Sequence, residues 1–308
     1  MADSDNITME DLKRRQAELN KLHGAVKPPT KTKKQFKAPP KSAMTAAEVQ
    51  AWEEQNAPVQ KPVQLDLFPD YEEVGAMPNT IARSALFSPV CRGRRGYVKE
   101  EIVASRKDAT ITFSGLRLDM GDSDVFMQSI RLAAEYDLGV EFQIQPYGFL
   151  SAIGRGGKRK PGKTDLEWLQ RSLRRLKAGI LTVETDKYLV DLSLIDEYAY
   201  DKETGVHQIR INPKIVSLFR REQYGLIDWQ KRKEIGVDLG KWLQTYVASN
   251  TGPQKIHIEK IREWSGQKDR RLDKFRKTLI KAFERLDELQ IVTGFNLDER
   301  GYISYERV

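Results

Sequence analysis

One stretch of this sequence has the spacing of a phosphate-binding loop. Residues 157–164 read Gly-Lys-Arg-Lys-Pro-Gly-Lys-Thr, which fits the pattern G-x-x-x-x-G-K-[ST] at the start of a predicted helix. In an ATPase, Lys163 and Thr164 would hold phosphate and a metal ion. Asp191 or Asp196, after an apolar strand, would supply the acid on the metal side.

The context of this loop argues against nucleotide chemistry. A phosphate loop should directly follow a buried strand, so that its amides surround the phosphates, whereas residues 149–154 are typical of a short helix that ends in glycine. Three adjacent cations would repel one another, and Pro161 removes an amide donor that phosphate needs. We therefore expect no catalytic residue, no cofactor and no enzyme.

Metal and redox chemistry have little support in the sequence. A rolling-circle nicking enzyme needs paired histidines around a metal, but His23, His207 and His257 stand far apart. Cys91 is the single cysteine, so there is no intramolecular disulfide and no zinc ligand set. The sequence predicts no metal site.

Positive charge is concentrated in two segments. Residues 155–177 contain nine Lys or Arg against two acidic residues, and residues 255–285 contain eleven against five. In helices predicted over 164–177 and 269–289, large apolar residues from Leu166 and Leu272 onward repeat at three- and four-residue steps, with cations on the opposite face. A basic amphipathic helix after a turn suits the major groove of DNA, where such cations bond phosphates and guanine edges.

The predicted DNA contacts combine the turn before the first basic helix, whose cations would hold the phosphate backbone, with the outer faces of both helices. They are Arg155, Lys158, Arg159, Lys160, Lys163, Arg171, Arg174, Arg175, Lys268, Arg270, Lys274, Lys277 and Lys281. The alternative for each helix alone is a solvated charged surface. Two such helices, each after a helix-turn and before a predicted hairpin, favour DNA contact.

An apolar peptide lies in a segment rich in Pro and Lys. Residues 64–68 read Gln-Leu-Asp-Leu-Phe between Pro62 and Pro69, so they cannot join a helix and would stay exposed unless a partner supplied a groove. Alternating apolar residues over 63–67 also fit a short edge strand. The residues expected to bind the partner are Gln64, Leu65, Leu67 and Phe68.

Two linked motifs carry a resemblance to a known family. The peptide resembles the one by which bacterial replication proteins bind the ring-shaped sliding clamp, with glutamine first and an aliphatic-aromatic pair last. Shortly after it, residues 76–87 (Ala-Met-Pro-Asn-Thr-Ile-Ala-Arg-Ser-Ala-Leu-Phe) are similar to the signature segment of the TrfA family of plasmid replication initiators, some members of which carry a clamp-like peptide just upstream.

The resemblance implies a protein that binds direct repeats (iterons) in a plasmid origin as a monomer and self-associates as a dimer that limits copy number. It also implies opening of adjacent AT-rich DNA, with single-stranded origin DNA as a further partner. The host sliding clamp (the beta subunit of DNA polymerase III) and the replicative helicase would be recruited. A winged-helix repressor that regulates copy number is the alternative, and it would have no use for the clamp peptide.

The predicted fold class is α+β, with two tandem winged helix-turn-helix domains over 77–221 and 222–308. A largely disordered N-terminal region over 1–76 carries the docking peptide. Predicted helices cover 122–138, 146–153, 164–177, 237–248, 256–264 and 269–289; predicted strands cover 109–113, 140–144, 180–183, 189–195, 207–211, 291–295 and 302–305. No apolar run approaches the ~20 residues that span a bilayer, and the polar start lacks a signal peptide, so we expect a cytoplasmic bacterial protein.

Overall fold

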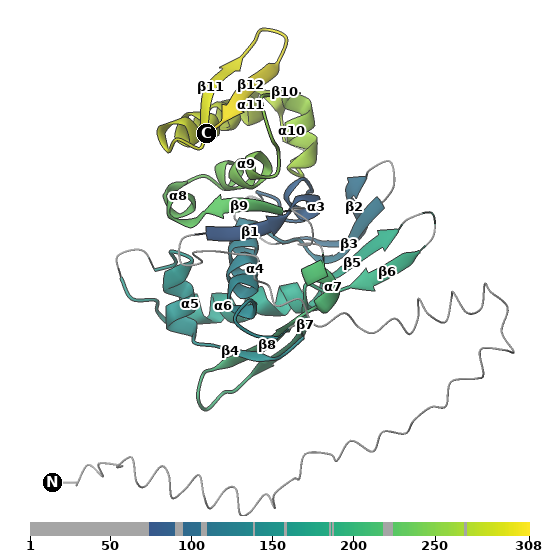
Figure 1. The fold of residues 1–308 in the computed structure, drawn as a ribbon, viewed down its shortest axis with the longest axis vertical. Coiled ribbons are helices and arrows are strands. Elements are labelled where there is room, and N and C mark those ends of the chain that lie inside the picture. The colour runs from purple at the N-terminus through teal and green to yellow at the C-terminus, as the bar shows by residue number, and fades with distance from the viewer. Residues whose placement is uncertain are drawn as a thin grey trace, which may run out of the picture. The chain divides into compact units, whose positions relative to one another are not determined.

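The chain folds into a mixed α+β structure, shown in Figure 1, in a computed structural model that describes residues 74–89, 95–105, 110–137, 139–156, 159–184, 186, 188–217, 224–267 and 270–308. Residues 1–73 of the expected disordered region, with the clamp-like peptide at 64–68, and also Lys158 and Lys268 lie outside the described residues. The last three residues of that region, 74–76, are not disordered but belong to strand β1 (Val74–Pro78). All described residues belong to one compact unit over 61–308. None of the described helices is long and apolar enough to cross a membrane.

Residues 74–217 form what we term the first half. Its elements are β1 (Val74–Pro78), α3 (Asn79–Ala82), β2 (Tyr97–Ser105), β3 (Thr110–Leu116), α4 (Met120–Ala133), β4 (Phe142–Ile144), α5 (Pro146–Ala152), α6 (Lys163–Ala178), β5 (Ile180–Glu184), β6 (Leu189–Leu192), β7 (Ile195–Tyr200), β8 (His207–Ile211) and α7 (Pro213–Ser217). The long helix α6 covers the 164–177 segment in which the sequence predicts a basic helix.

Residues 224–308 form the second half. Its elements are β9 (Tyr224–Asp228), α8 (Trp229–Glu234), α9 (Asp238–Ala248), β10 (Gln254–His257), α10 (Ile258–Trp264), α11 (Leu272–Glu288), β11 (Val292–Leu297) and β12 (Tyr302–Arg307). The second predicted basic helix is present as α11, but it begins at Leu272 rather than at residue 269.

The order of elements is repeated between the halves. The first half contains the succession α4, β4, α5, α6 and the β7–β8 hairpin, and the second contains α9, β10, α10, α11 and the β11–β12 hairpin. The two three-stranded antiparallel sheets have matching strand orders, β4-β8-β7 and β10-β12-β11. The first half differs by an inserted β5–β6 hairpin, which joins β2 and β3 in a sheet of order β2-β3-β5-β6.

The long helices form where apolar periodicity and capping agree. Leu169, Leu173 and Leu176 are fully buried along α6, as the repeat predicts. The Asp165 carboxylate accepts a hydrogen bond from the Gly162 N–H at 2.9 Å, which caps the start of α6. In α11, the predicted apolar face is buried except for Leu272, which is 38% exposed because it lies in the first turn.

Three local predictions were wrong. The strand expected over 189–195 is two strands, because β6 pairs with β5 whereas β7 turns away to pair with β8. The helix expected over 256–264 is present as α10 but begins at Ile258, because residues 256–257 belong to strand β10, which pairs with β12. No strand was predicted at β1, β2 or β9.

The two halves share a strand pair and a buried ion cluster. Strands β1 and β9 pair antiparallel and lie side by side between the halves in Figure 1, with Val74 opposite Asp228. Asp124 of α4 forms ion pairs of 2.6 Å with both Arg232 of α8 and Lys241 of α9. These contacts hold α4 and α9 against each other.

Candidate nucleic-acid interface

The exposed face of α11 is basic along its first ten residues. Lys274, Arg276, Lys277 and Lys281 are all exposed, and within the described ranges no carboxylate oxygen lies within 4 Å of their charged nitrogens. The end of the helix differs, because Arg285 there pairs with a neighbouring glutamate at 2.8 Å. A recognition helix usually contacts bases through its N-terminal residues, where Lys274, Arg276 and Lys277 lie, and Lys281 is one turn further along.

Arg270 is held at the start of α11 and does not project freely. Its Nη2 donates to Thr278 Oγ1 at 2.8 Å and its Nη1 donates to Gln267 Oε1 at 3.3 Å. Its carbonyl accepts a hydrogen bond from Arg262 at 3.0 Å. Arg270 thus stabilises the turn between α10 and α11.

The outer face of α6 carries fewer unpaired cations than that of α11. Lys160, Lys163 and Arg174 are exposed. The Arg171 guanidinium lies 3.7 Å from Glu167, four residues earlier on the same helix. Exposed pairs of this type hold their partners weakly, so Arg171 stays available for a phosphate.

Two arginines of the turn before α6 share one carboxylate. Asp165 lies 3.4 Å from Arg155 and 3.1 Å from Arg159. The hydrogen bond from the Gly162 amide, and then the two guanidinium groups, lower the pKa of Asp165, against the opposing effect of burial. The carboxylate therefore keeps its charge and restrains both cations.

Arg155 also lies over an aromatic ring. Its guanidinium carbon is 3.7 Å from the centroid of Trp168, which is a cation-π contact. Burial lowers the pKa of Arg155, and the Asp165 charge opposes that effect. Within the described residues its buried Nε makes no hydrogen bond that meets the geometric limits, although it faces Asp165 Oδ1 at 3.4 Å. The side chain is thus part of the packing of this turn.

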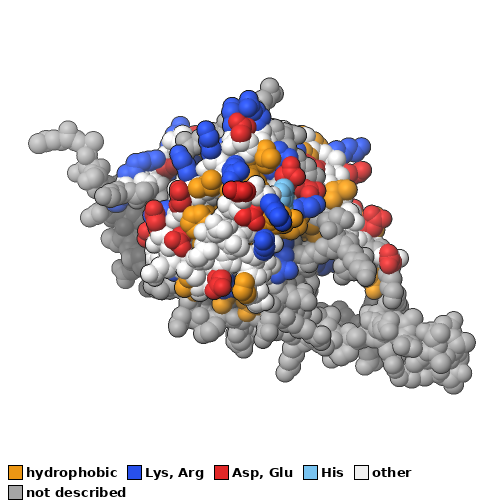
Figure 2. Space-filling view, turned by 90° about the horizontal axis from the view of Figure 1, so that it is seen from above, with side chains coloured by type: hydrophobic (Ala, Val, Ile, Leu, Met, Phe, Trp, Pro, Cys, Tyr) orange, Lys and Arg blue, Asp and Glu red, His pale blue; other side chains and the backbone are white. Residues whose placement is uncertain are grey.

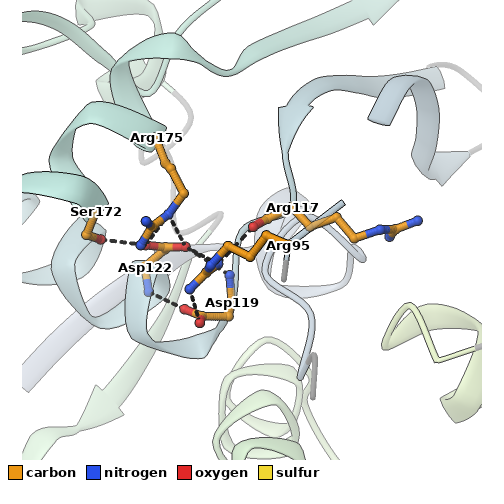
Figure 3. A network of polar contacts seen from close by, with 6 residues as sticks. All are labelled: Arg95, Arg117, Asp119, Asp122, Ser172 and Arg175. Carbon is orange, nitrogen blue, oxygen red and sulfur yellow. Dashed lines mark hydrogen bonds and ion pairs between the residues drawn. The ribbon is translucent and has the colours of Figure 1, made fainter. Parts of the chain in front are cut away.

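Arg175 does not lie on the outer face of α6, where the sequence places it. Figure 3 shows it directed at Asp122 of α4, at 2.6 Å, and only 10% of its side chain is exposed. Ser172 donates to the same carboxylate oxygen at 2.5 Å, and Arg95 binds the other oxygen at 2.8 Å. Because Asp122 lies on another helix, helical periodicity alone could not reveal this contact.

A second acid strengthens this network. The N-cap residue of α4, Asp119, also binds Arg95, as Figure 3 shows. Burial and the neighbouring Asp122 raise the pKa of Asp119, while Arg95 lowers it. The network joins α4, α6 and Arg95, two residues before β2, so it fixes α6 in position.

The three-stranded sheet of the second half adds cations that the predicted site omits, one from β10 and one from the β11–β12 turn. Lys255, Arg300 and Tyr302, with Asp298 and Glu299, line a hollow of about 550 Å³. The Lys255 ammonium lies 5.4 Å from the centroid of the Tyr302 ring and 3.7 Å from Asp298. The hairpin was predicted, but Arg300 lies outside the two basic segments of the sequence and follows two acidic residues, Asp298 and Glu299. Figure 2 shows Lys and Arg interspersed with Asp and Glu on the face seen from above.

Two crystal structures share this fold. Domains 2 and 3 of RctB match with a TM-score of 0.55 at 12% identity, covering 75% of this chain and 98% of that one. The Pi initiator protein in complex with iteron DNA matches with a TM-score of 0.52 at 15% identity, covering 78% of this chain and 98% of that one. At such identities the likeness is one of fold.

The sequence comparison identifies the family. The chain belongs to the TrfA protein family, whose sequence model matches residues 41–299. The plasmid replication initiator protein TrfA of Escherichia coli is 27% identical over 238 residues, which are 73% of this chain. The match spans 61% of that relative's length. The resemblance seen in residues 76–87 is therefore confirmed.

Proposed function

We propose that this protein initiates plasmid replication by binding iterons through two winged helix-turn-helix units, whose reading helices are α6 and α11. The observation that carries the proposal is the repeated order of elements, in which a long amphipathic helix with exposed cations precedes a hairpin in each half. Family membership and the fold shared with an initiator crystallised on iteron DNA support it.

The cations of α11 have the spacing that groove binding needs. Lys274, Lys277 and Lys281 follow one another at three and four residues, so they lie on one face of the helix. Inserted in the major groove, they would reach phosphates and base edges, while Lys255 and Arg300 of the hairpin region would reach the adjacent backbone. In the first half, Lys163 and Arg174 would do the same from α6.

The test is a mobility shift with a cloned origin that carries direct repeats, at ~150 mM salt and with excess competitor DNA. We expect a ladder of discrete complexes. A smear that competitor abolishes would contradict the proposal.

Single variants locate the contacts. Lys277→Ala should weaken binding and reduce the slope of log K against log salt by about 1, because one phosphate contact is lost. Lys99→Ala, which removes an exposed lysine of β2, is the matched control and should change neither quantity. Equal losses from both variants would place α11 outside the groove.

Recruitment of the sliding clamp is proposed for the peptide at 64–68, which lies outside the described residues. Its support is the sequence motif alone. Leu67→Ala combined with Phe68→Ala should abolish capture of the purified clamp and plasmid replication while origin binding stays intact. That result would argue against the copy-number repressor, whereas replication that survives the change would remove the clamp from the proposal.

The later steps of initiation complete the proposal: opening of AT-rich DNA, helicase recruitment and a monomer-dimer equilibrium. Permanganate reactivity of origin thymines tests opening, and equilibrium sedimentation tests self-association. Thymines that stay unreactive in the discrete complexes would remove the opening step.

We further propose that the protein is not an ATPase, and two features of the loop support this. Helix α5, and not a strand, precedes the loop. The Gly162 amide is already bonded to Asp165, whose negative charge lies where a phosphate would bind. Magnesium-dependent ATP hydrolysis that disappears in Lys163→Ala would overturn this proposal.

A further inference from the structure

The residues that follow α3 are bonded to both halves of the molecule, a feature that the proposed DNA contacts do not use. We term residues 83–89 the clasp segment. It includes the end of the signature segment that marks the family in the sequence. Its first contacts are with α9 and the residue that follows it: Arg83 Nε donates to Ser249 Oγ at 3.1 Å, and Trp242 Nε1 donates to the Ser84 carbonyl at 3.2 Å.

The far end of the clasp segment contacts the turn between α10 and α11. Gln267 Nε2 donates to the Pro89 carbonyl at 2.5 Å. Gly266 has φ +72°, and a Cβ there would lie 3.0 Å from the Cβ of Ser88 and 3.3 Å from that of Ala85. The clasp segment therefore lies directly against the turn that starts α11.

The opposite side of the clasp segment is bonded to the first half. The Ser88 amide donates to the Leu118 carbonyl at 3.1 Å, beside a parallel bridge from Phe87 to Leu118. The Phe87 ring packs on Phe126 of α4 with 5.7 Å between centroids. Phe87 and Ser88 are nearly fully buried. The clasp segment is therefore packed against α4, and α4 in turn binds α6 through Asp122.

A continuous series of contacts thus runs from α6 through α4 and the clasp segment to the start of α11. We propose that the clasp segment fixes the distance and rotation between the two DNA-reading helices, so that the protein measures the spacing between two half-sites within its DNA. Arg83 and Gln267 are the positioning residues. This inference rests on the proposed function of α6 and α11.

The spacing between two half-sites strongly affects affinity, because DNA is a helix and each added base pair both shifts and rotates one half-site relative to the other. Inserting one base pair moves one half-site by ~3.4 Å along the axis and rotates it by ~34°, which removes the contacts of one reading helix. Each lost base contact costs a factor of ~10 or more in affinity. A rigid pair of helices should therefore reject the insertion, and a loosened pair should accept it.

The experiment uses the full chain and a repeat whose protected region has been mapped by hydroxyl-radical footprinting. Arg83→Met combined with Gln267→Ala removes two side-chain links between the clasp segment and the second half. The control, Arg307→Met with Gln254→Ala, removes the same residue types where they bond carbonyls within the second half. Dissociation constants are measured for the native repeat and for repeats with one or two base pairs inserted at the centre.

We expect the wild type and the control to lose at least ~10-fold in affinity on insertion, and the clasp variant to lose several-fold less, with equal non-specific binding in all three. Wild-type discrimination in the folded clasp variant would overturn the inference. If the wild type binds the native repeat no better than competitor DNA, the proposed function itself fails. If it binds specifically but tolerates insertion as well as the variant does, only the inference fails.

A measurement without DNA shows whether the clasp variant changes the relative position of α6 and α11 or only weakens DNA binding in general. Spin labels at Glu167→Cys in α6 and Glu284→Cys in α11, with Cys91→Ser, report the distance between the helices. We expect a narrow distance distribution in the wild type and the control and a broader one in the clasp variant. An unchanged distribution in the clasp variant would overturn the inference.

Discussion

Arg232 is the residue whose loss should most weaken the contact between the halves. Its side chain is 2% exposed, and its Nε lies 2.6 Å from Asp124 of the other half. Its Nη1 also donates to the Lys241 carbonyl at 3.1 Å and to Thr245 Oγ1 at 3.1 Å. The perturbation is Arg232→Met, which keeps most of the volume of the side chain and removes its charge and donors.

The expected loss in the free energy of unfolding depends on the buried Asp124 charge that remains after the substitution. Removing one partner of a buried ion pair usually costs about 3–5 kcal/mol, because the other charge remains buried without compensation. Here Asp124, 7% exposed, keeps Lys241 at 2.6 Å on its second oxygen. We therefore expect the lower end, about 3 kcal/mol, which is a large fraction of a total stability of about 5–15 kcal/mol.

Urea unfolding followed by circular dichroism and tryptophan fluorescence measures the effect, in a cycle with Asp124→Asn and the double variant. Because each single change removes a partner from a charge that stays buried, the double variant should be about 2 kcal/mol more stable than additivity predicts. Arg271→Met is the control, since its pair with Asp273 is exposed and should be worth less than about 1 kcal/mol. A loss below about 1 kcal/mol for Arg232→Met, or an additive cycle, would refute the reasoning.

Two further perturbations test the packing of each half. Burial lowers the pKa of His207 from 6.5 to about 4, so the free energy of unfolding should be highest above pH 6.5 and fall by up to about 3 kcal/mol as the pH drops to 4, because the unfolded chain binds the proton first. His207→Gln should remove this dependence and His257→Gln should keep it; a profile unchanged by His207→Gln would contradict the assignment. A Cβ at Gly225 would lie 2.7 Å from backbone atoms of α9. Gly225→Ala should thus cost about 1–3 kcal/mol in thermal unfolding, whereas Gly236→Ala, which meets nothing within 4 Å, should change stability by less than about 0.5 kcal/mol. Equal melting temperatures for these two variants would refute the packing argument.

Local signals predicted the long helices correctly. The apolar repeat located α4, α6, α9 and α11, because each buries one stripe against the core and carries polar residues elsewhere. The hairpin of β11 and β12 was also predicted, since a polar turn with Gly301 separates two short apolar runs. These elements depend on residues close in sequence, which a single sequence displays.

Elements that depend on distant partners were missed. Strands β1 and β9 are short and each contains a glycine, and their pairing joins residues about 150 positions apart, such as Val74 and Asp228. Within the site, Arg175 has the spacing of an outer-face residue, but Ser172 and Leu176 beside it are buried and Asp122 arrives from α4. The face of α6 that packs against the protein therefore includes Ser172 and Arg175 in addition to the leucines that the sequence pattern identifies.

The two halves share an order of elements, but under the proposed function they would not contribute equally to DNA binding. In the second half, three residues separate α11 from the hairpin strand β11, so the hairpin follows the helix directly. In the first half, the β5–β6 insertion places sixteen residues between α6 and β7, and Arg175 is held by Asp122. The unpaired cations are more numerous on α11 than on α6 in the described chain. Under the proposed function, the second half therefore supplies most of the electrostatic affinity, and the first half contributes mainly through the position at which the clasp segment holds it.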